Sequence, residues 1–339
     1  MTDAELLALP KVQLHCHLEG TLRAATFRDL AARHGVEIGA RALVPIEEAY
    51  NFATFRDFLL LFAEVCKALA EPADFARLAE DYVSVAVAEG VRYAEVFVSP
   101  SVWTYFHKDL DVRATFAALR GTFDRANAEH GIDVRMICDL TRNFGAERAL
   151  QTAEIAVAMR DLGVIAVGLG GDEANFPPSL YVESYARARA AGLHGVVHAG
   201  EAAGAASVRS AIEDLGAERI GHGVRAIEDP SVVALLAERK IPIEVCPTSN
   251  HLTGAAPAHL DHPMGALDAA GVIVTIDADD PALFGTSLLA EYRFVEQKLG
   301  HSTLLRFARN AIGASFADDQ TKARLHAAFD GAAARVVEV

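Results

Sequence analysis

The sequence is poor in cysteine, in positive charge and in long apolar runs. Its 339 residues include four cysteines, none in a CxxC or CxxH pair, which argues against a disulfide framework and against a thiolate zinc site. No uninterrupted apolar stretch is long enough to cross a bilayer, and the N-terminal residues are acidic where a secretory signal is basic. We therefore expect reduced, mostly buried thiols and a cytoplasmic location.

Positive charge is outweighed, since 31 Lys and Arg residues stand against 46 Asp and Glu residues, a formal net charge of -15. This balance repels phosphate backbones and anionic membranes, so we expect neither nucleic acid nor a membrane as a partner. An uncharged small molecule, such as a nucleoside or a base, remains compatible. The sequence also lacks a linker, a low-complexity tract and a repeat of fixed sequence, and no pattern indicates an oligomeric state. These absences predict one domain over residues 1–339.

What the sequence does contain is a regular alternation of apolar, β-branched runs with Ala-, Leu- and Arg-rich stretches of helical period. The predicted strands are a first run ending in His15 and His17, followed by residues 92–98, 134–139, 164–169, 195–198, 219–222, 242–246 and 271–276. Eight strands alternating with helices predict an α/β fold, a parallel (β/α)8 barrel of the TIM type rather than a doubly wound sheet. Residues 21–90 are too long for a simple crossover and predict a helical lid insertion, whereas residues after about 287 predict extra C-terminal helices that close and flank the barrel.

The first predicted strand ends in two histidines at spacing i, i+2. Strand side chains alternate between faces, so His15 and His17 should project the same way and Cys16 the opposite way. The pair is half of a metal site. Alone it is weak evidence, because an isolated strand histidine is more often a hydrogen-bonded core residue than a ligand.

Further polar residues gather at the predicted carboxyl ends of other strands, where barrels of this type carry their active sites. They are Gly170 to Glu173, His198 to Glu201, His222, Cys246 to Asn250, and Asp277 to Pro281. Each has an ordinary structural interpretation, as a packed residue, a cap or a turn. Together, however, acids and imidazoles that converge are electrostatically costly without a cation. Three imidazoles and one carboxylate suit zinc with an open position for a water, whose pKa zinc lowers toward ~7.

Five motifs, in this order and at these separations, resemble the adenosine/adenine deaminase family of zinc-dependent (β/α)8 enzymes over essentially the whole chain. They are His15-Cys16-His17-Leu18-Glu19-Gly20, His198-Ala199-Gly200-Glu201, Arg219-Ile220-Gly221-His222-Gly223, Cys246-Pro247-Thr248-Ser249-Asn250 and Asp279-Asp280-Pro281. The resemblance implies hydrolytic deamination of a purine and one Zn²⁺ per chain. It implies that the zinc ligands are His15, His17, His198 and Asp279.

The resemblance also implies roles for four further positions. Glu201 corresponds to the residue that protonates the purine N1, and His222 to the residue that orients the attacking hydroxide and helps to move its proton. Asp280 corresponds to the residue that holds this hydroxide and bonds the purine on its N7 side, while the backbone of Gly171 would meet N3. Addition at C6, protonation at N1 and loss of ammonia form a coherent sequence of steps.

The segment Asp57–Phe62 is similar to the apolar gate of the family, with Leu59 and Phe62 facing the substrate together with His17. An ordinary helix core fits its periodicity equally well. The remaining nine histidines lie in apparent loops or helices and are predicted to be surface or packing residues: His34, His107, His130, His194, His251, His259, His262, His301 and His326.

Two local features favour a nucleoside as the substrate. Residues 170–173, Gly-Gly-Asp-Glu, resemble the Gly-Asp-Glu run of adenosine deaminases, where adenine deaminases tend to carry Ser-Ser-Glu. Gly221 points the same way, because the adenine branch usually has Asp there. Glu19 is a departure, since many adenosine deaminases place there an Asp that bonds the ribose 5′-hydroxyl. Asp277 is another, because the family commonly has Asn there; on the same face as Asp279, it could tighten zinc or raise a neighbour's pKa.

Our leading hypothesis is deamination of adenosine and 2′-deoxyadenosine to the inosine nucleosides and ammonia. Adenine and 5′-substituted adenosines such as aminodeoxyfutalosine remain alternative substrates. A purine-binding signalling protein without catalysis is a second class of hypothesis, which the presence of all three predicted catalytic residues disfavours. Zinc hydrolysis of an ester or lactone is a third, disfavoured because no lysine sits at a strand end to bridge two metals.

Overall fold

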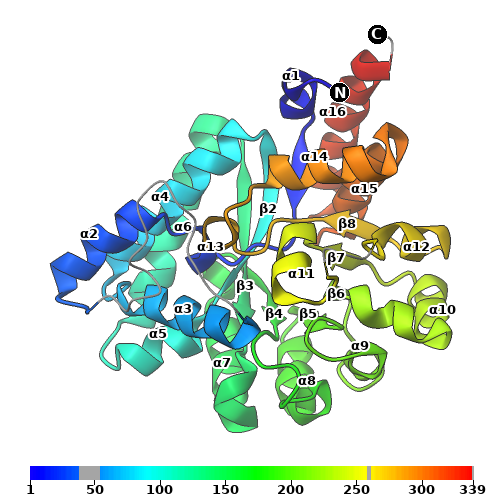
Figure 1. Cartoon of the computed structure of the whole chain (residues 1–339). Helices are drawn as coiled ribbons and strands as arrows, with labels where there is room; N and C mark the ends of the chain where they lie inside the picture. The colour runs from blue at the N-terminus through cyan, green and yellow to red at the C-terminus, as the bar shows by residue number, and fades with distance from the viewer. Residues whose placement is uncertain (38–53, 258–260, 338–339) are drawn as a thin grey trace.

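The structure, a computed structural model, describes residues 1–37, 54–257 and 261–337. Its eight strands are all parallel, and each pairs with the next along the chain. They are β1 (Lys11–Gln13), β2 (Val91–Val98), β3 (Asp133–Asp139), β4 (Val164–Gly168), β5 (His194–Ala199), β6 (Arg219–His222), β7 (Ile243–Val245) and β8 (Val274–Ile276). The predicted (β/α)8 barrel is confirmed (Figure 1).

The barrel closes between the ends of β8 and β1, just beyond the strands themselves. Cys16 and Asp279 form an isolated parallel bridge, in which the His17 amide donates to the Asp279 carbonyl at 2.9 Å and the Asp279 amide donates to the His15 carbonyl at 3.1 Å. The prediction that the first strand reaches the two histidines is therefore wrong, because β1 ends at Gln13. The two histidines lie instead on residues 14–17, the segment after β1 that closes the barrel against residues beyond β8 and that we call the closing segment.

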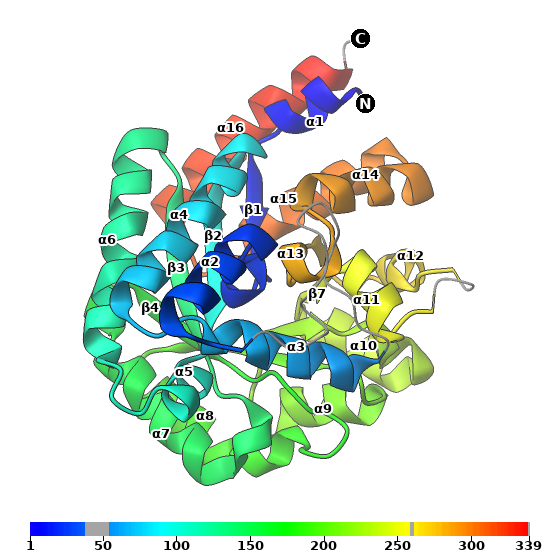
Figure 2. The same ribbon diagram turned by 60° about the vertical axis from the view of Figure 1, so that its left-hand side comes forward.

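Helices follow the strands and surround the barrel (Figure 2). Between β2 and β8 they are α5 (Pro100–Phe106), α6 (Val112–His130), α7 (Gly145–Ala158), α8 (Val182–Ala190), α9 (Ala205–Glu213), α10 (Pro230–Arg239), α11 (Pro247–Thr253) and α12 (Met264–Ala269). Local signals set several of their ends. The Asp111 carboxylate caps the first turn of α6 by accepting from the Ala114 amide, and Gly131 ends that helix in the left-handed conformation.

The segment between β1 and β2, predicted as a lid, contains α2 (Ala24–His34), α3 (Phe55–Lys67) and α4 (Pro72–Ala88). Gly35 ends α2 in the left-handed conformation, and Thr54 caps α3. The ring of Phe58 in α3 stacks on Phe284 at 4.7 Å, so α3 reaches α13 (Pro281–Phe284), which follows β8. Residues 38–53 of the predicted lid, and His259, lie outside the described residues.

The C-terminal helices α14 (Leu288–Leu299), α15 (His301–Ala314) and α16 (Asp319–Val337) flank the barrel, as predicted. The side chain of Asn310 in α15 donates to the Val274 carbonyl of β8 at 3.0 Å, which ties α15 to the sheet. The N-terminal helix α1 (Asp3–Ala8) lies beside this group, next to α16 (Figures 1 and 2). Among the described residues, no helix is long and apolar enough to span a membrane.

Candidate metal centre and active site

Four side chains from three parts of the chain converge where the barrel closes: His15 and His17 after β1, His198 in β5 and Asp279 after β8. The Nε2 atoms of His15 and His17 lie 3.4 and 3.5 Å from Asp279 Oδ1. The Nε2 atom of His17 lies 3.1 Å from Nε2 of His198 at the end of β5. All four side chains are almost fully buried. The structure thus brings together the residues predicted to be zinc ligands.

These separations fit a cation among the four residues. Two ligands bonded tetrahedrally to zinc at about 2.0–2.1 Å are about 3.3 Å apart, close to the distances found here. The Nε2 atom of His15 is buried and has no hydrogen-bond partner among the described residues. Burial opposes protonation of His15, but the nearby carboxylates of Asp279 and Glu244 outweigh this and raise its pKa to about 10. The buried Asp279 carboxylate is therefore stabilised by a positive charge beside it, and a metal ion would supply that charge.

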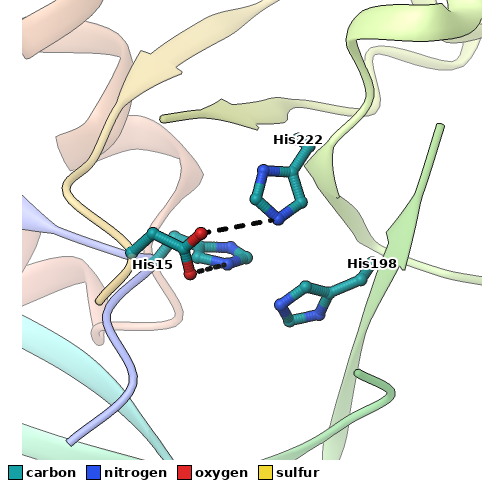
Figure 3. A group of neighbouring side chains, drawn as sticks. His15, His198 and His222 are labelled. Atoms are coloured by element: carbon teal, nitrogen blue, oxygen red, sulfur yellow. Dashed lines mark ion pairs between the residues drawn. The ribbon is translucent and has the colours of Figure 1, made fainter. Parts of the chain in front are cut away.

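His222 at the end of β6 lies in the same cluster. Its Nε2 atom is 3.9 Å from Asp279 Oδ2 and 3.6 Å from Glu201 Oε2. Nitrogen or oxygen atoms of His15, His198, His222 and Asp279 all lie within 4.8 Å of one another. Figure 3 shows His15, His198 and His222 pointing into one space. This end of the cavity therefore offers more nitrogen and oxygen atoms able to bind a metal ion than the four predicted ligands alone.

Two residues of this cluster have strained backbone. His222 has φ +60° and Asp279 has φ +61°, in the left-handed region that non-glycine residues seldom occupy. Each such residue costs about 1–3 kcal/mol and persists only where the surroundings impose it. Here the strain turns both side chains toward the common centre, and strand alternation alone would not predict this.

A buried ion-pair network beneath the cluster orients His15. The ring donates from Nδ1 to Glu244 Oε2 at 2.8 Å, which leaves Nε2 free to face the metal position. Glu244 Oε1 accepts from Arg219 Nε at 2.5 Å, and Arg219 Nη2 donates to Glu95 Oε2 at 2.6 Å. Sequence reasoning missed this network. Its signal was the presence of charged residues inside otherwise apolar strands.

A second relay fixes the tautomer of His222. The Met264 amide donates to His262 Nδ1 at 3.2 Å, so His262 Nε2 carries the proton and donates to Asn250 Oδ1 at 3.3 Å. The Asn250 amide group then donates to His222 Nδ1 at 3.0 Å. His222 consequently presents Nε2–H to the cluster, and burial lowers its pKa to about 3. The prediction that His262 is only a surface or packing residue is incomplete, because it acts through Asn250 on His222.

Glu201 is held by a loop that another carboxylate organises. Glu173 Oε1 accepts from the Gly200 amide at 2.7 Å, and its Oε2 accepts from the amides of Glu201, Ala202 and Ala203 at 3.1, 2.7 and 2.9 Å. Burial, then the charges of Asp279 and Glu173, raise the pKa of Glu201 well above its usual range. The raised pKa favours the protonated form of Glu201, from which the side chain can donate a proton.

Asp280 packs against the backbone of Gly20. A Cβ atom at position 20 would lie 1.8 Å from Asp280 Oδ1, so only glycine leaves room for this carboxyl group. Burial and the neighbouring Asp279 raise the pKa of Asp280 well above its usual range. Its Oδ1 atom has no partner among the described residues. A similar fit occurs at Gly221, where a Cβ would lie 2.7 Å from the His15 ring.

A cavity of about 730 Å³ opens above these residues, within the range of small-molecule sites. It is lined by His17, His198, Glu201, His222, Asp279, Asp280 and Gly171 from the barrel and by Leu59 and Phe62 from α3. The ring of Phe62 lies 6.0 Å from that of His17, at the entrance to the metal cluster. The predicted gate residues therefore lie beside the predicted catalytic residues.

A family model described as adenosine deaminase matches residues 10–331 of the chain. The chain belongs to the adenosine deaminase family. It is therefore a hydrolytic deaminase that acts on an amidine C–N bond, as the five sequence motifs predicted.

Relatives of this deaminase carry three different names. The chain is 36% identical to an adenine deaminase of Streptomyces coelicolor, over 94% of both chains. It is 38% identical to an aminodeoxyfutalosine deaminase of Acidothermus cellulolyticus, over 94% of this chain and 90% of the relative. It is 34% identical to an adenosine deaminase of Shewanella denitrificans, over 95% and 98% respectively. Substrates of the adenine and adenosine type are common to these names.

Solved structures agree with this placement. An adenine deaminase from Arthrobacter aurescens superposes with a TM-score of 0.89 at 31% identity, covering 98% of this chain and all of that one. An amidohydrolase from Burkholderia ambifaria, solved with bound zinc, superposes with a TM-score of 0.90 at 29% identity, covering 99% and 93%. The fold is thus shared over nearly the whole chain, and one of these two neighbours contains zinc.

Glu19 lies elsewhere in this deaminase than its sequence position suggested. Its carboxylate is fully buried and accepts from the Ser99 amide at 2.8 Å and from Trp103 Nε1 at 2.6 Å. It is not among the residues that line the cavity. Burial raises its pKa to about 7. The predicted contact between Glu19 and a ribose 5′-group stays a prediction.

Asp277 points away from the metal cluster, so the expectation that it shares a face with Asp279 is wrong. Its Oδ1 atom accepts from the amides of Leu14 and His15 at 2.6 and 3.0 Å, and its Oδ2 atom accepts from Thr275 Oγ1 at 3.0 Å. The reason is that β8 ends at Ile276, after which the chain turns and alternation no longer holds. The Asp277 carboxylate replaces ladder hydrogen bonds at the barrel seam.

Proposed function

We propose that this deaminase converts adenosine and 2′-deoxyadenosine to the inosine nucleosides and ammonia with one bound Zn²⁺. The observation that carries the proposal is the convergence, in one cavity, of a buried cluster suited to a cation with the carboxyl group of Glu201, whose pKa burial raises. A cation that activates a water and an acid that protonates the leaving ring are the two requirements of hydrolytic deamination.

His15, His17, His198 and Asp279 would hold the zinc ion, and the zinc-containing amidohydrolase structure supports this choice of metal. When bound, zinc lowers the pKa of a coordinated water toward about 7. The contribution of the protein is geometric. Glu244 fixes the His15 ring, and the barrel closure fixes Asp279.

Glu201, His222 and Asp280 would perform the proton transfers. Glu201, whose protonated form is favoured by burial, would donate its proton to the purine N1, which removes the negative charge that develops as the nucleophile adds at C6. His222 presents Nε2–H toward Asp279 and Glu201 and so orients the attacking oxygen. Asp280 lies beside Asp279, where its carboxyl group would bond the purine on the N7 side.

The cavity walls would position the ring. Gly171 has φ +98°, and a Cβ atom there would lie 2.3 Å from Asn143 Oδ1, so its backbone is the part presented to the cavity and to N3. Leu59 and Phe62 from α3 supply apolar cover that would exclude water from the reacting centre.

The names of the relatives support two other substrates as strongly as adenosine. Identities of 36% to an adenine deaminase and 38% to an aminodeoxyfutalosine deaminase are no lower than the 34% to an adenosine deaminase. The cavity of about 730 Å³ has room for more than a bare base, which favours a nucleoside.

A panel of purines tests the proposal. The zinc-loaded protein is assayed for ammonia release from adenosine, 2′-deoxyadenosine, adenine, AMP and aminodeoxyfutalosine, and the substrates are ranked by kcat/KM. We expect adenosine and 2′-deoxyadenosine to exceed the others by at least about tenfold, a difference of about 1.4 kcal/mol. Consumption of adenine with adenosine left untouched would refute the substrate. Turnover that is unchanged after metal removal would refute the role of zinc.

A further inference from the structure

The cavity has two unlike walls. The metal cluster comes from the closing segment of β1 and from the ends of β5, β6 and β8. The wall formed by the ends of β2, β3 and β4 contributes none of these residues. Its lining includes the polar residues Ser99, Asp139, Thr141, Asn143 and Asp172 and the backbone of Gly170 and Gly171, beside apolar and aromatic residues such as Val102 and Phe144.

One carboxylate in this second wall has an oxygen without a partner. Asp139 ends β3 and is only 4% exposed. Its Oδ2 atom accepts from the Thr141 amide at 3.3 Å and from Thr141 Oγ1 at 3.2 Å. Its Oδ1 atom has no hydrogen-bond partner among the described residues. Buried polar atoms in native proteins are nearly always hydrogen-bonded, so this atom requires a partner in the cavity.

The surroundings of Asp139 keep this oxygen uncovered. A Cβ atom at Gly168 or Gly170 would lie 3.2 or 3.1 Å from Asp139 Oδ1, so glycine at both positions leaves space beside it. Thr141, which binds the other oxygen, has φ +39°, a strained value for a β-branched residue. Its hydroxyl also accepts from Ser101 Oγ at 2.9 Å. Thr141 thus holds Oδ2 of the carboxylate, the Gly170 backbone lies close to both oxygens, and Oδ1 has no hydrogen bond among the described residues.

We infer that Asp139 is a specificity-determining residue, whose free carboxylate oxygen accepts a hydrogen bond from a sugar hydroxyl of a nucleoside substrate. The inference rests on the proposed function, because a purine with C6 at the metal cluster directs its N9 substituent away from that cluster. The β2–β4 wall is where such a substituent would lie.

Other carboxylates near this wall are placed differently. Glu19 binds the Ser99 amide and Trp103 through Oε1; its Oε2 also lacks a partner among the described residues, but Glu19 does not line the cavity. Glu64 lines the cavity with an unpartnered Oε2, but it belongs to α3 and not to the β2–β4 wall. Asp172 lines the cavity, but it accepts from the backbone and side-chain amides of Asn175 at 3.2 and 2.8 Å. Asp139 is therefore the acceptor that the wall offers to a neutral hydroxyl, and its charge disfavours a phosphate group in the same place.

The test compares Asp139→Asn with the parent holoenzyme on adenosine, 2′-deoxyadenosine, 3′-deoxyadenosine, 5′-deoxyadenosine and adenine. In the variant the remaining oxygen must face Thr141, so an amide NH₂ replaces the free acceptor. We expect kcat/KM for adenosine to fall about tenfold, mainly through KM, with less than a twofold change for adenine. The deoxynucleosides identify which hydroxyl Asp139 binds. The analogue that lacks this hydroxyl should have a low kcat/KM with the parent, and the Asp139→Asn substitution should not lower that value further.

A matched control is Asp133→Asn, which removes a carboxylate from the opposite end of the same strand and should leave the substrate ranking unchanged. Affinity for inosine and for hypoxanthine, measured by calorimetry, separates this inference from the proposed function, because it requires no turnover. A parent that prefers inosine, and loses that preference in Asp139→Asn, supports the inference even if deamination of adenosine fails. An equal loss for nucleosides and bases, or no loss for nucleosides, would overturn it.

Discussion

Two clusters of buried charge lie one above the other in this barrel, and they differ in how far their atoms are satisfied. In the lower cluster, Arg219 donates to Glu95, to Glu244 and to the Ala314 carbonyl. Glu95 also accepts from the Tyr93 hydroxyl and the Phe316 amide. Every charged atom there has a partner, as a structural network requires.

In the upper cluster, which consists mainly of histidines and aspartates, the side chains are also buried, but hydrogen-bond partners are missing. His15 Nε2 and Asp280 Oδ1 have none among the described residues, and three imidazoles face one carboxylate. His15 belongs to both clusters, with Nδ1 bound below and Nε2 open above. The comparison teaches that burial alone does not mark a functional site. A functional site is marked instead by buried polar atoms that lie close together and lack hydrogen-bond partners.

The sharpest test of the comparison removes the acid of the upper cluster. Glu201→Gln retains the shape but cannot donate a carboxyl proton, so we expect kcat to fall by about 10³-fold with metal content unchanged. Glu213→Gln, in an exposed pair with Arg209 on α9, is the control and should keep full activity. Equal turnover by Glu201→Gln and the parent would remove Glu201 from the mechanism.

The second prediction concerns the link between the clusters. Glu244→Gln weakens the bond that holds His15 Nδ1, so we expect zinc affinity to fall about 10–100-fold, measured by competition with a chelator. Glu218→Gln provides a matched comparison, because Glu218 binds His194 Nδ1 at 2.9 Å on the surface. If both variants retain the parent affinity, the lower cluster does not support the metal centre.

The third prediction concerns Glu173, a carboxylate with a full set of hydrogen bonds that positions Glu201 in the upper cluster. In Glu173→Gln the amide nitrogen cannot accept from the backbone amides around Glu201, so the loop shifts. We expect kcat to fall about tenfold or more, with zinc binding retained. Loss of zinc in proportion to activity would show instead that Glu173 supports the fold as a whole.

The smallest effect is expected at Asp277, a carboxyl group with hydrogen bonds but no cation. Burial, with the charge of Glu244, raises its pKa from 3.8 to about 7. Since the folded state then binds a proton more tightly than the unfolded state, this group's contribution to stability is complete below about pH 4 and is lost as the pH rises through about 7.

Asp277→Asn retains an oxygen for the Leu14 and His15 amides and carries no charge. We expect the free energy of unfolding to be unchanged near pH 4 and to rise at pH 8 by about 1–3 kcal/mol relative to the parent, measured by urea titration. A variant less stable than the parent at both pH values would contradict this assignment of the Asp277 charge.

Much of the molecule followed from local sequence patterns. Alternating apolar runs and helical periods predicted eight parallel strands, because these periods depend on backbone geometry alone. Motif order predicted residues that the structure brings together at one cavity, and Gly35 marked the end of α2. The family and the reaction class were therefore accessible before any contact was known.

Only the tertiary structure decided where side chains point once the strands have ended. Glu19 turned into the protein, Asp277 turned to the barrel seam, and Asp139 presented an open oxygen to the cavity. His262 was found to act on His222 through Asn250. The reason is physical: strand periodicity fixes side-chain direction only while the backbone stays extended, whereas beyond the strand ends direction depends on hydrogen bonds between residues far apart in the chain.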